Sequence, residues 1–259
     1  MKERVQKIIA QWGIASRRQA EALISEGRVR LNGEVVQLGQ KADPKRDRLE
    51  VDGKHLKTCD RPEPIYLLLH KPQGVVTTCA DPQGRQTVLD LLPKQWQQGQ
   101  GIHPVGRLDT DSTGALLLTN DGALTQAIAH PRSHIKKLYH VWVVGHPTPA
   151  TINRWQTGII LDGQKTLPTT IKVLTQRTDR TLLAISLCEG RNRQIRRIAE
   201  QLGHPVLKLH RTAIGPVQLQ GADQPRLPVG QYRPLSPREL QSIRKASAMT
   251  ALKHNRPNY

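Results

Sequence analysis

The segment GRLDTDSTGALLLTNDG, residues 106–122, decides the fold more than any other part of the chain. Its first half is rich in charged and turn-forming residues, and its second half contains the apolar run 115–118, which is typical of a buried strand. Rigid scaffolds often present functional groups on the loops beside such strands. The sequence therefore predicts a strand preceded by a loop in which Asp109 and Asp111 are candidates for chemistry.

Three interpretations of this loop follow from its residues alone. Asp109, Asp111 and Thr113 match the DxDxT pattern of magnesium-dependent phosphotransferases, but no continuous apolar strand precedes them and no paired downstream acids supply a metal site. The loop also imitates the opening of a calcium loop, which needs an acidic ligand at its twelfth position, and Asn120 occupies that position. For Asp111 and its neighbour Ser112, a turn that only caps backbone amides is an open alternative to a direct role.

Strand-like runs and helical patterns alternate around this segment. The runs expected to form strands are 65–69, 115–118, 139–144, 170–174, 181–187 and 206–209. The apolar spacing of a helix occurs at 123–129, 150–156, 193–202 and 237–246, and a polar loop is expected at 95–101. This mixture predicts an α+β domain around a largely antiparallel sheet.

The first 60 residues predict a separate helix, helix, hairpin module. Apolar residues from Val5 to Trp12 form one helical stripe that stops at Gly13, and Ser16 with Gln19 makes a capping-box pattern before a second helix that ends at Gly27. The Asn-Gly pair at 32–33 then predicts a hairpin turn.

Domain boundaries follow from the prolines and the charges. Residues 57–64 contain two prolines and several charges and are interpreted as a linker. We expect the module at 1–60, a larger domain at 61–247 and a basic, flexible tail at 248–259.

The net charge of +18 points to a polyanionic partner. Residues 1–60 carry 13 basic and 9 acidic side chains, and the rest of the chain carries 26 and 12, so the larger domain is also expected to bind nucleic acid. The three cysteines never form a C-x-x-C pair, which favours a reducing cytoplasm over a disulfide framework or a thiolate zinc site. No apolar signal core or run of roughly 20 apolar residues predicts secretion or a membrane partner.

The strings VQKIIA (5–10) and ASRRQAEALISEGRVRLNG (15–33) resemble the S4 RNA-binding module. The resemblance implies that four basic residues face RNA phosphates, and the alternative is that they are ordinary solvated helix charges. These residues are Arg4, Lys7, Arg17 and Arg18.

The segment 106–122 resembles the catalytic loop of the ribosomal RNA pseudouridine synthases that carry an N-terminal S4 module. The resemblance extends over nearly the whole chain, because further family motifs follow in the family's order. They are HKPQGVVTT (70–78), HPR (130–132), KKLYHV (136–141) and EGRNRQIRR (189–197).

The resemblance implies a role for each matching residue. Asp109 is the catalytic carboxylate, acting either as a nucleophile at C1′ or as a base at C2′. Arg196 is its ionic partner, with a generic phosphate-binding basic face as the alternative. Tyr139 stacks on the uracil, with a tyrosine of a core strand as the alternative. Arg107 helps to extrude the target nucleotide or holds a phosphate. Arg191, Arg193 and Arg197 are expected to contact the RNA backbone. Lys71 is a further candidate for RNA contact, but a structural use of its turn is favoured.

The expected reaction needs neither a metal nor an organic cofactor, because isomerisation requires no redox step and no group donor. The expected partner of this cytoplasmic, monomeric enzyme is ribosomal RNA, 23S in preference to 16S, free or within a pre-ribosomal particle. Two other functions stay open at this point: a non-catalytic S4-type RNA-binding factor for ribosome assembly, and the magnesium-dependent phosphotransferase.

Overall fold

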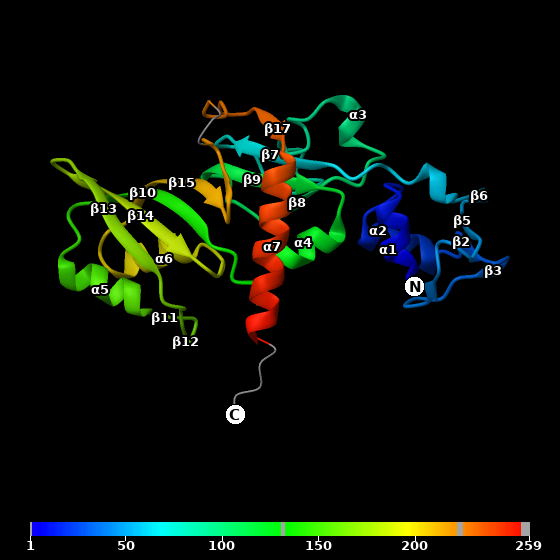
Figure 1. Ribbon diagram of the computed structural model, residues 1–259, viewed down its shortest axis with the longest axis horizontal. Coiled ribbons are helices and arrows are strands. Elements are labelled where there is room, and N and C mark those ends of the chain that lie inside the picture. The colour runs from blue at the N-terminus through cyan, green and yellow to red at the C-terminus, as the bar shows by residue number, and fades with distance from the viewer. Residues whose placement is uncertain (1, 131–132, 222–224, 255–259) are drawn as a thin grey trace. The chain divides into compact units, whose positions relative to one another are not determined.

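The computed structural model describes residues 2–130, 133–221 and 225–254, and Figure 1 shows their arrangement. The chain forms two compact units. The first contains Met1–Tyr66, Leu89–His103 and Leu118–Gly122, and the second contains Leu67–Val88, Pro104–Leu117 and Ala123–Tyr259. The predicted domain boundaries at 60 and 247 stay a prediction.

The first unit contains the two helices that the sequence predicts. They are α1 (Val5–Gln11) and α2 (Arg17–Ser25). Ser16 and Gln19 form the capping box: the Ser16 hydroxyl accepts from the Gln19 amide at 3.3 Å, and the Gln19 side chain accepts from the Ser16 amide at 2.9 Å. These two bonds satisfy amides that the first turn of a helix leaves without partners.

A small sheet with strand order β3-β2-β5-β6 packs against these helices. Its strands are β2 (Val29–Leu31), β3 (Glu34–Val35), β5 (Leu49–Val51) and β6 (Lys54–His55), and β1 (Glu3–Arg4) pairs separately with β4 (Lys41–Ala42). Asn32 and Gly33 both have positive φ, at 54° and 93°, so the predicted hairpin turn is confirmed.

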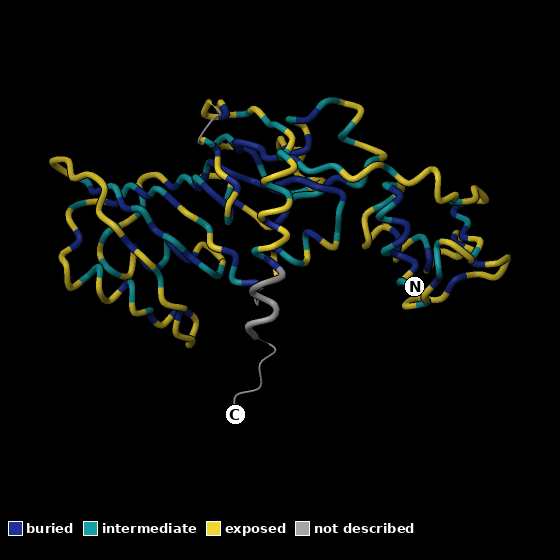
Figure 2. Tube along the Cα trace, in the orientation of Figure 1, coloured by how far each residue is buried: buried dark blue, intermediate teal, exposed yellow. Residues whose placement is uncertain are grey.

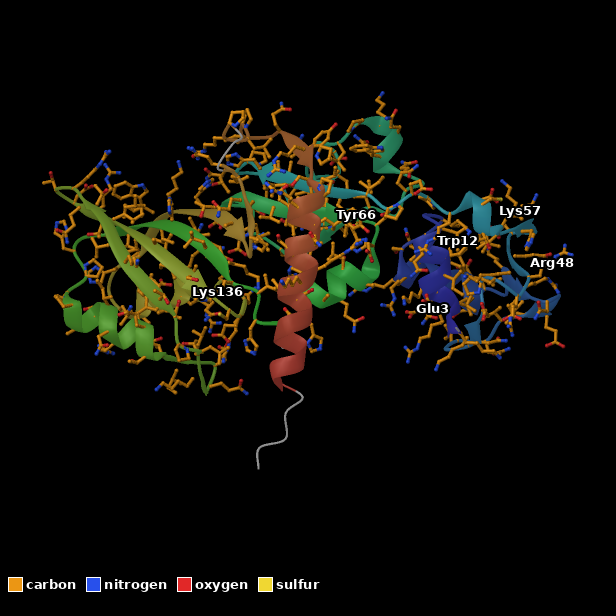
Figure 3. The ribbon with its side chains drawn as sticks, viewed as in Figure 1. Glu3, Trp12, Arg48, Lys57, Tyr66 and Lys136 are labelled. Carbon is orange, nitrogen blue, oxygen red and sulfur yellow. The ribbon has the colours of Figure 1, made fainter. Side chains whose placement is uncertain are left out.

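The predicted linker contains one short helical turn, η1 (Thr58–Asp60). The Trp12 indole donates a hydrogen bond to the Lys57 carbonyl at 2.8 Å, which fixes the start of this segment on α1, and both residues are labelled in Figure 3. At its far end Asn120 holds the backbone on both sides: its side chain accepts from the Ile65 amide and donates to the Glu63 carbonyl, each at 2.8 Å.

A nine-stranded sheet forms the centre of the fold, in the order β13-β14-β10-β15-β9-β7-β17, with β16 beside β15 and β8 beside β9 (Figure 1). The strands that the sequence predicts are β7 (Tyr66–Lys71), β9 (Thr113–Thr119), β10 (Lys137–Val144), β13 (Thr170–Gln176), β14 (Arg180–Leu187) and β15 (Val206–Ile214). The sequence did not predict β8 (His103–Val105), β16 (Val217–Gln218), β17 (Tyr232–Pro234), or the separate hairpin of β11 (Ile160–Leu161) and β12 (Gln164–Lys165). The contact between β15 and β9 is parallel, whereas β10 pairs antiparallel with both β14 and β15, so the predicted α+β class with a largely antiparallel sheet is confirmed.

The main helices after residue 120 are close to those that the sequence predicts. They are α4 (Gly122–Ala129), α5 (Pro149–Thr157), α6 (Gln194–Gln201) and α7 (Pro237–His254). Two predictions were wrong in extent. The expected polar loop contains the short α3 (Lys94–Gln97), and α7 continues through 248–254, where a flexible tail was expected, while 255–259 lie outside the described residues.

The core of the second unit lies on one face of β10 and β14. Alternate residues of each strand are buried, as in a sheet with one covered face, and Trp155 of α5 and Ile198 of α6 pack against them. β7 and β9 are almost wholly buried, visible as dark blue tubes in Figure 2. Within the described part of the chain, no helix is both long enough and apolar enough to cross a membrane.

Candidate active site

Asp109 lies on the loop between β8 and β9, and buried residues fix this loop on both sides of it. Leu108 is 6% exposed, and its backbone carbonyl and amide both bond to the Thr77 hydroxyl, at 2.7 and 3.3 Å. Ser112 is 1% exposed, and its amide donates to the Asp109 carbonyl at 3.0 Å. The Asp109 side chain itself is 35% exposed, so a rigid turn presents a carboxylate that a substrate can reach.

Lys71 supports this loop from inside the protein. Its side chain is fully buried, and its ammonium donates to the carbonyls of Pro72 at 2.9 Å and Ser112 at 3.0 Å. Burial lowers the pKa of Lys71 to about 8, although the charges of Asp111 and Asp109 oppose that shift. These contacts support the structural alternative for Lys71, and its contact with RNA stays a prediction.

The loop then enters β9 at a close backbone approach to β15. Arg211 pairs with Gly114 in the parallel register, and a Cβ atom on Gly114 would lie 2.2 Å from the Arg211 carbonyl oxygen. The Thr113 hydroxyl is hydrogen bonded to His210 Nδ1 at 2.8 Å. Gly114, the glycine of the DSxG pattern, is therefore required for two reasons: a side chain would collide with Arg211, and its φ is +117°.

Two guanidinium groups lie against the two carboxylates of the loop. Arg193 Nη1 lies 3.4 Å from Asp109 Oδ2, and its Nη2 lies 3.3 Å from Asp111 Oδ2. Arg196 contacts Asp111 Oδ1 at 3.3 Å and the Ser112 hydroxyl at 3.1 Å, while its Nε lies 4.0 Å from Asp109 Oδ2. The structure thus places Arg196 beside Asp109, as the resemblance implies, but it also places Arg193 there, which was expected to bind the RNA backbone.

Asp111 contacts the same two arginines as Asp109. The sequence left the role of Asp111 open. Burial alone would raise the pKa of Asp111, but the hydrogen bond from Arg193 and the charge of Arg196 outweigh it and hold this pKa below its usual value. Burial lowers the pKa of Arg196, against the charge of Asp111. Asp111 and the two arginines therefore form a charged network beside Asp109.

The start of α6 sets the positions of these arginines. Arg193 has a left-handed backbone, with φ at 46°, and serves as the N-cap of α6. A non-glycine residue in this conformation stores strain, which is common at functional sites. The predicted helix 193–202 therefore begins one residue later than expected, and Arg193 projects from a turn while Arg196 projects from the helix.

Two of the expected RNA contacts are occupied by the protein itself. Arg191 donates to the carbonyls of Gln164 at 3.0 Å and Lys165 at 2.9 Å, and Arg197 forms an ion pair with Asp162. Both arginines tie the α6 region to the β11–β12 hairpin. Their contact with RNA stays a prediction, and the contacts seen here are structural.

A pocket of about 390 Å³ opens beside Asp109. Tyr139, which is 8% exposed, forms part of its wall together with Arg107 and Arg196. The sequence predicted no role for two further cationic residues of the wall, Lys137 and Arg211. Arg211 could have been found from its pattern, because it falls on the apolar face of β15 between Leu209 and Ala213, but the predicted strand ended at Leu209.

The four basic residues of the S4-like module lie on its first elements. Arg17 and Arg18 are exposed at the start of α2, and neither has an ion-pair partner among the described residues. Arg4 is exposed before α1, and Lys7 forms an ion pair with Glu3 at 3.2 Å.

Chemically, the site places the carboxylate of Asp109, several guanidinium groups and the ring of Tyr139 around a pocket large enough for a small ring system. No cluster of three or more histidine, cysteine or acidic side chains placed to hold a metal occurs within the described residues. The arrangement suits nucleophilic or acid–base chemistry at a carbon atom of a polyanion.

Comparison with known proteins identifies the family. The family model for RNA pseudouridylate synthase matches residues 65–201, and the S4 domain model matches residues 3–47. The chain is 42% identical over 245 residues to the ribosomal large subunit pseudouridine synthase B of Bacillus subtilis, covering 93% of this chain and 96% of that protein. It is 37% identical to the protein of the same name from Pseudomonas aeruginosa, covering 93% of this chain and 61% of that one.

A solved structure agrees with this assignment. The crystal structure of a pseudouridylate synthase is 31% identical, with a TM-score of 0.65, and the match covers 93% of this chain and 99% of that one. The fold and the site define an RNA-modifying enzyme with a separate RNA-binding module. The chain belongs to the RNA pseudouridylate synthase family and carries an S4 domain, so it is an isomerase of uridine in RNA and the two alternative functions fall away.

Proposed function

We propose that this enzyme converts one uridine of large-subunit ribosomal RNA to pseudouridine in the pocket beside Asp109. The names of the Bacillus and Pseudomonas relatives support the large subunit, and therefore 23S rather than 16S RNA, as the substrate class. The excess of basic residues and the S4 domain support a structured RNA partner, free or within a pre-ribosomal particle. The proposal takes the enzyme as a cytoplasmic monomer.

One observation carries the proposal: the carboxylate of Asp109 and the ring of Tyr139 line the same pocket, with Arg196 beside them. A uridine within an RNA helix cannot reach such a pocket unless it leaves the stack. Arg107 lies two residues before Asp109 on the pocket wall, where its guanidinium can take the place of the extruded base or hold a phosphate. Tyr139 then stacks on the uracil, a contact worth roughly 1 to 3 kcal/mol per base.

Asp109 acts on the ribose in either of two ways. Its carboxylate attacks C1′ while the bond from C1′ to N1 breaks, or it removes the proton at C2′ while the same bond breaks. In both routes the uracil turns within the pocket and C5 forms the new bond to C1′. In the first route the ester bond between Asp109 and C1′ breaks as this bond forms, and in the second route C2′ regains its proton. C5 then loses its proton and N1 gains one. Substrate and product are isomers, so the balance needs no co-reactant.

The charged network orients Asp109 for this step. Arg193 touches both carboxylates, whereas Arg196 is held by Asp111 and Ser112 and turns its Nε toward Asp109. That Nε has no hydrogen-bond partner among the described residues. A distance of 4.0 Å in the free enzyme can shorten when substrate excludes water, because catalytic hydrogen bonds often tighten only in the complex.

The test is incubation of the purified enzyme with unmodified 23S and 16S transcripts in excess chelator, followed by mapping of pseudouridine at single-nucleotide resolution. The proposal predicts one new pseudouridine in the 23S transcript and none in the 16S transcript. Modification of 16S RNA alone would contradict the substrate class. If both free transcripts stay unmodified, the same assay on large-subunit precursor particles must yield the site, and its failure there contradicts the proposal.

A further inference from the structure

Arg211 is the most deeply buried cation of the pocket wall, and the roles proposed above do not use it. Its side chain is 3% exposed. Its Nε donates to the Ala115 carbonyl at 2.7 Å, and its Nη1 donates to the Arg107 carbonyl at 3.5 Å. Its Nη2 is buried without any hydrogen-bond partner among the described residues.

No carboxylate of the described chain forms an ion pair with Arg211. Burying an unpaired charge and leaving a donor unsatisfied are both costly. The charge of Arg211 is also felt nearby: burial, and then the charge of Arg211, lowers the pKa of Lys137 on the same pocket wall. The pocket thus contains concentrated positive charge that the protein does not neutralise, which is the environment expected around a ligand that carries or develops negative charge.

The position of Arg211 in the sheet directs it toward the bound base. Arg211 pairs with Tyr139 across β15 and β10, so both side chains emerge on the same face of the sheet. The guanidinium carbon lies 6.0 Å from the centre of the Tyr139 ring. Because Arg211 and Tyr139 line the same pocket, a base stacked on Tyr139 would lie beside the guanidinium of Arg211.

We propose that Arg211 is a catalytic residue whose Nη2 donates a hydrogen bond to a carbonyl oxygen of the uracil and stabilises the base as it leaves C1′. This inference rests on the proposed function, because it needs uridine in the pocket. The bound uracil would then be the hydrogen-bond partner that Nη2 lacks in the free protein.

The chemistry of the leaving group explains why a cation is useful there. When the bond from C1′ to N1 breaks, N1 keeps the electron pair and the uracil leaves as an anion, whose charge is shared with O2 and O4. The same anion forms whether Asp109 attacks C1′ or removes the C2′ proton. A fixed guanidinium stabilises it more strongly than the neutral base of the bound substrate, which lowers the barrier instead of only tightening binding.

A purely structural role would use only Nε and Nη1, which join the carbonyls of Arg107 and Ala115 around the catalytic loop. Such a role predicts that substitutions change stability and affect every substrate equally. The proposed role predicts a loss that depends on the chemistry of one uracil oxygen. The two can therefore be separated with modified substrates.

The first experiment compares the Arg211→Gln and Arg211→Lys variants with the wild type in single-turnover assays on the RNA substrate. We expect the rate of the chemical step to fall by about 100- to 1000-fold in Arg211→Gln, the size typical for loss of one stabilising donor, while RNA affinity changes by less than about threefold. Arg211→Lys keeps the positive charge but lacks the forked guanidinium group, so the rate of its chemical step should fall less than in Arg211→Gln. Arg154→Gln, an exposed arginine of α5, is the control and should match the wild type.

The second experiment replaces O2 or O4 of the target uridine with sulfur, a weaker hydrogen-bond acceptor. For each protein, the rate with oxygen is divided by the rate with sulfur at the same position of the uracil. At the oxygen that Nη2 contacts, this ratio should be about tenfold larger for the wild type than for either Arg211 variant, because the variants have already lost that bond. Equal ratios at both positions in all three proteins would overturn the inference, even if Arg211→Gln is slow or unstable. Absence of pseudouridine with wild-type enzyme on every RNA would instead contradict the proposed function.

Discussion

At the scale of single residues, Asp109 and Asp111 differ in surroundings although only one residue separates them. Asp111 is held by Arg193 and Arg196 through contacts of 3.3 Å, whereas Asp109 meets the same cations at 3.4 and 4.0 Å and lines the pocket. The better-paired carboxylate is suited to positioning, and the less constrained one is suited to reaction. This difference separates two roles that the DxD spacing alone does not distinguish.

Substitution of Asp111 tests this division of roles. In Asp111→Asn the arginines lose a charged partner but Asp109 is untouched, so we expect turnover to fall by about 10- to 100-fold through misplacement of Arg193 and Arg196. RNA affinity should be retained. A complete loss of turnover equal to that of an Asp109 variant would show that Asp111 takes part in the chemistry.

His210 predicts a pH dependence of stability. Burial, followed by the nearby charge of His70, lowers its pKa from 6.5 to about 4 in the folded protein, and three other basic groups act in the same direction: Arg226, His140 and Lys208. Between these pH values the unfolded chain binds a proton that the folded chain does not, so the free energy of unfolding falls as the pH drops from 6.5 toward 4, by at most about 3 kcal/mol.

The His210→Asn variant isolates this contribution, because asparagine can still bond to the Thr113 hydroxyl but does not titrate. Urea unfolding of both proteins at pH 7 and pH 5 should show a smaller loss of stability in the variant. The same loss in both would contradict the assignment. The comparison between the two proteins removes the effect of the other titrating groups.

Pocket residues that lie in local sequence motifs could be predicted, and those defined by tertiary contact could not. Asp109, Tyr139 and Arg196 lie in quoted motifs, and the structure brings all three to one pocket. The position of Lys71 beneath the loop depends on carbonyls about 40 residues away in sequence, and Arg211 meets a carbonyl 96 residues away. No spacing pattern in the sequence contains such contacts.

At the scale of elements, the parallel contact between β9 and β15 fixes the Asp109 loop to the rest of the sheet. It consists of the pairs His210 with Thr113 and Arg211 with Gly114. The contact brings the start of β9, immediately after the loop, beside the arginine of the pocket wall. The geometry of the loop therefore depends on whether two backbones can approach closely at Gly114.

The Gly114→Ala substitution should disrupt this junction. The added methyl group would collide with the Arg211 backbone, in addition to the strain of a positive φ, so we expect a loss of about 2 to 4 kcal/mol in stability and a large loss of activity. Gly84→Ala is the matched control, because Gly84 also has a positive φ, at +68°, but no atom lies within 4 Å of the added carbon. Equal thermal shifts for the two variants would contradict the packing argument.

The sequence predicted the elements with strong periodicity and missed those made by pairing alone. The two helices and the hairpin of the S4 domain carry capping and turn signals, and the long strands carry apolar runs, so they were found. The two- and three-residue strands, such as those of the β11–β12 hairpin, have no periodicity to detect.

At the scale of the whole molecule, the net charge of +18 should make RNA binding strongly dependent on salt. Arg17 and Arg18 of the S4 domain are exposed and have no ion-pair partner within the described residues. If both bind phosphates, the Arg17→Ala/Arg18→Ala double variant should weaken binding and lower the slope of log K against log salt by about 0.9 for each phosphate that the variant no longer neutralises.

Arg28 provides the control within the same domain, because it already forms ion pairs with Asp52 at 2.7 Å and Glu26 at 2.9 Å. The Arg28→Ala variant should leave the salt slope unchanged. Fluorescence anisotropy of labelled RNA at several salt concentrations measures both variants. An unchanged slope in the double variant would show that these arginines are ordinary solvated charges.

The central claim is that Asp109 performs the reaction while the surrounding cations and the S4 domain hold the RNA. The most direct measurement compares Asp109→Asn with the wild type for pseudouridine formation and RNA affinity in the same preparation. The account predicts no detectable product from Asp109→Asn, with a dissociation constant for RNA within about threefold of the wild type. Product formation by the Asn variant at a rate near that of the wild type would contradict it.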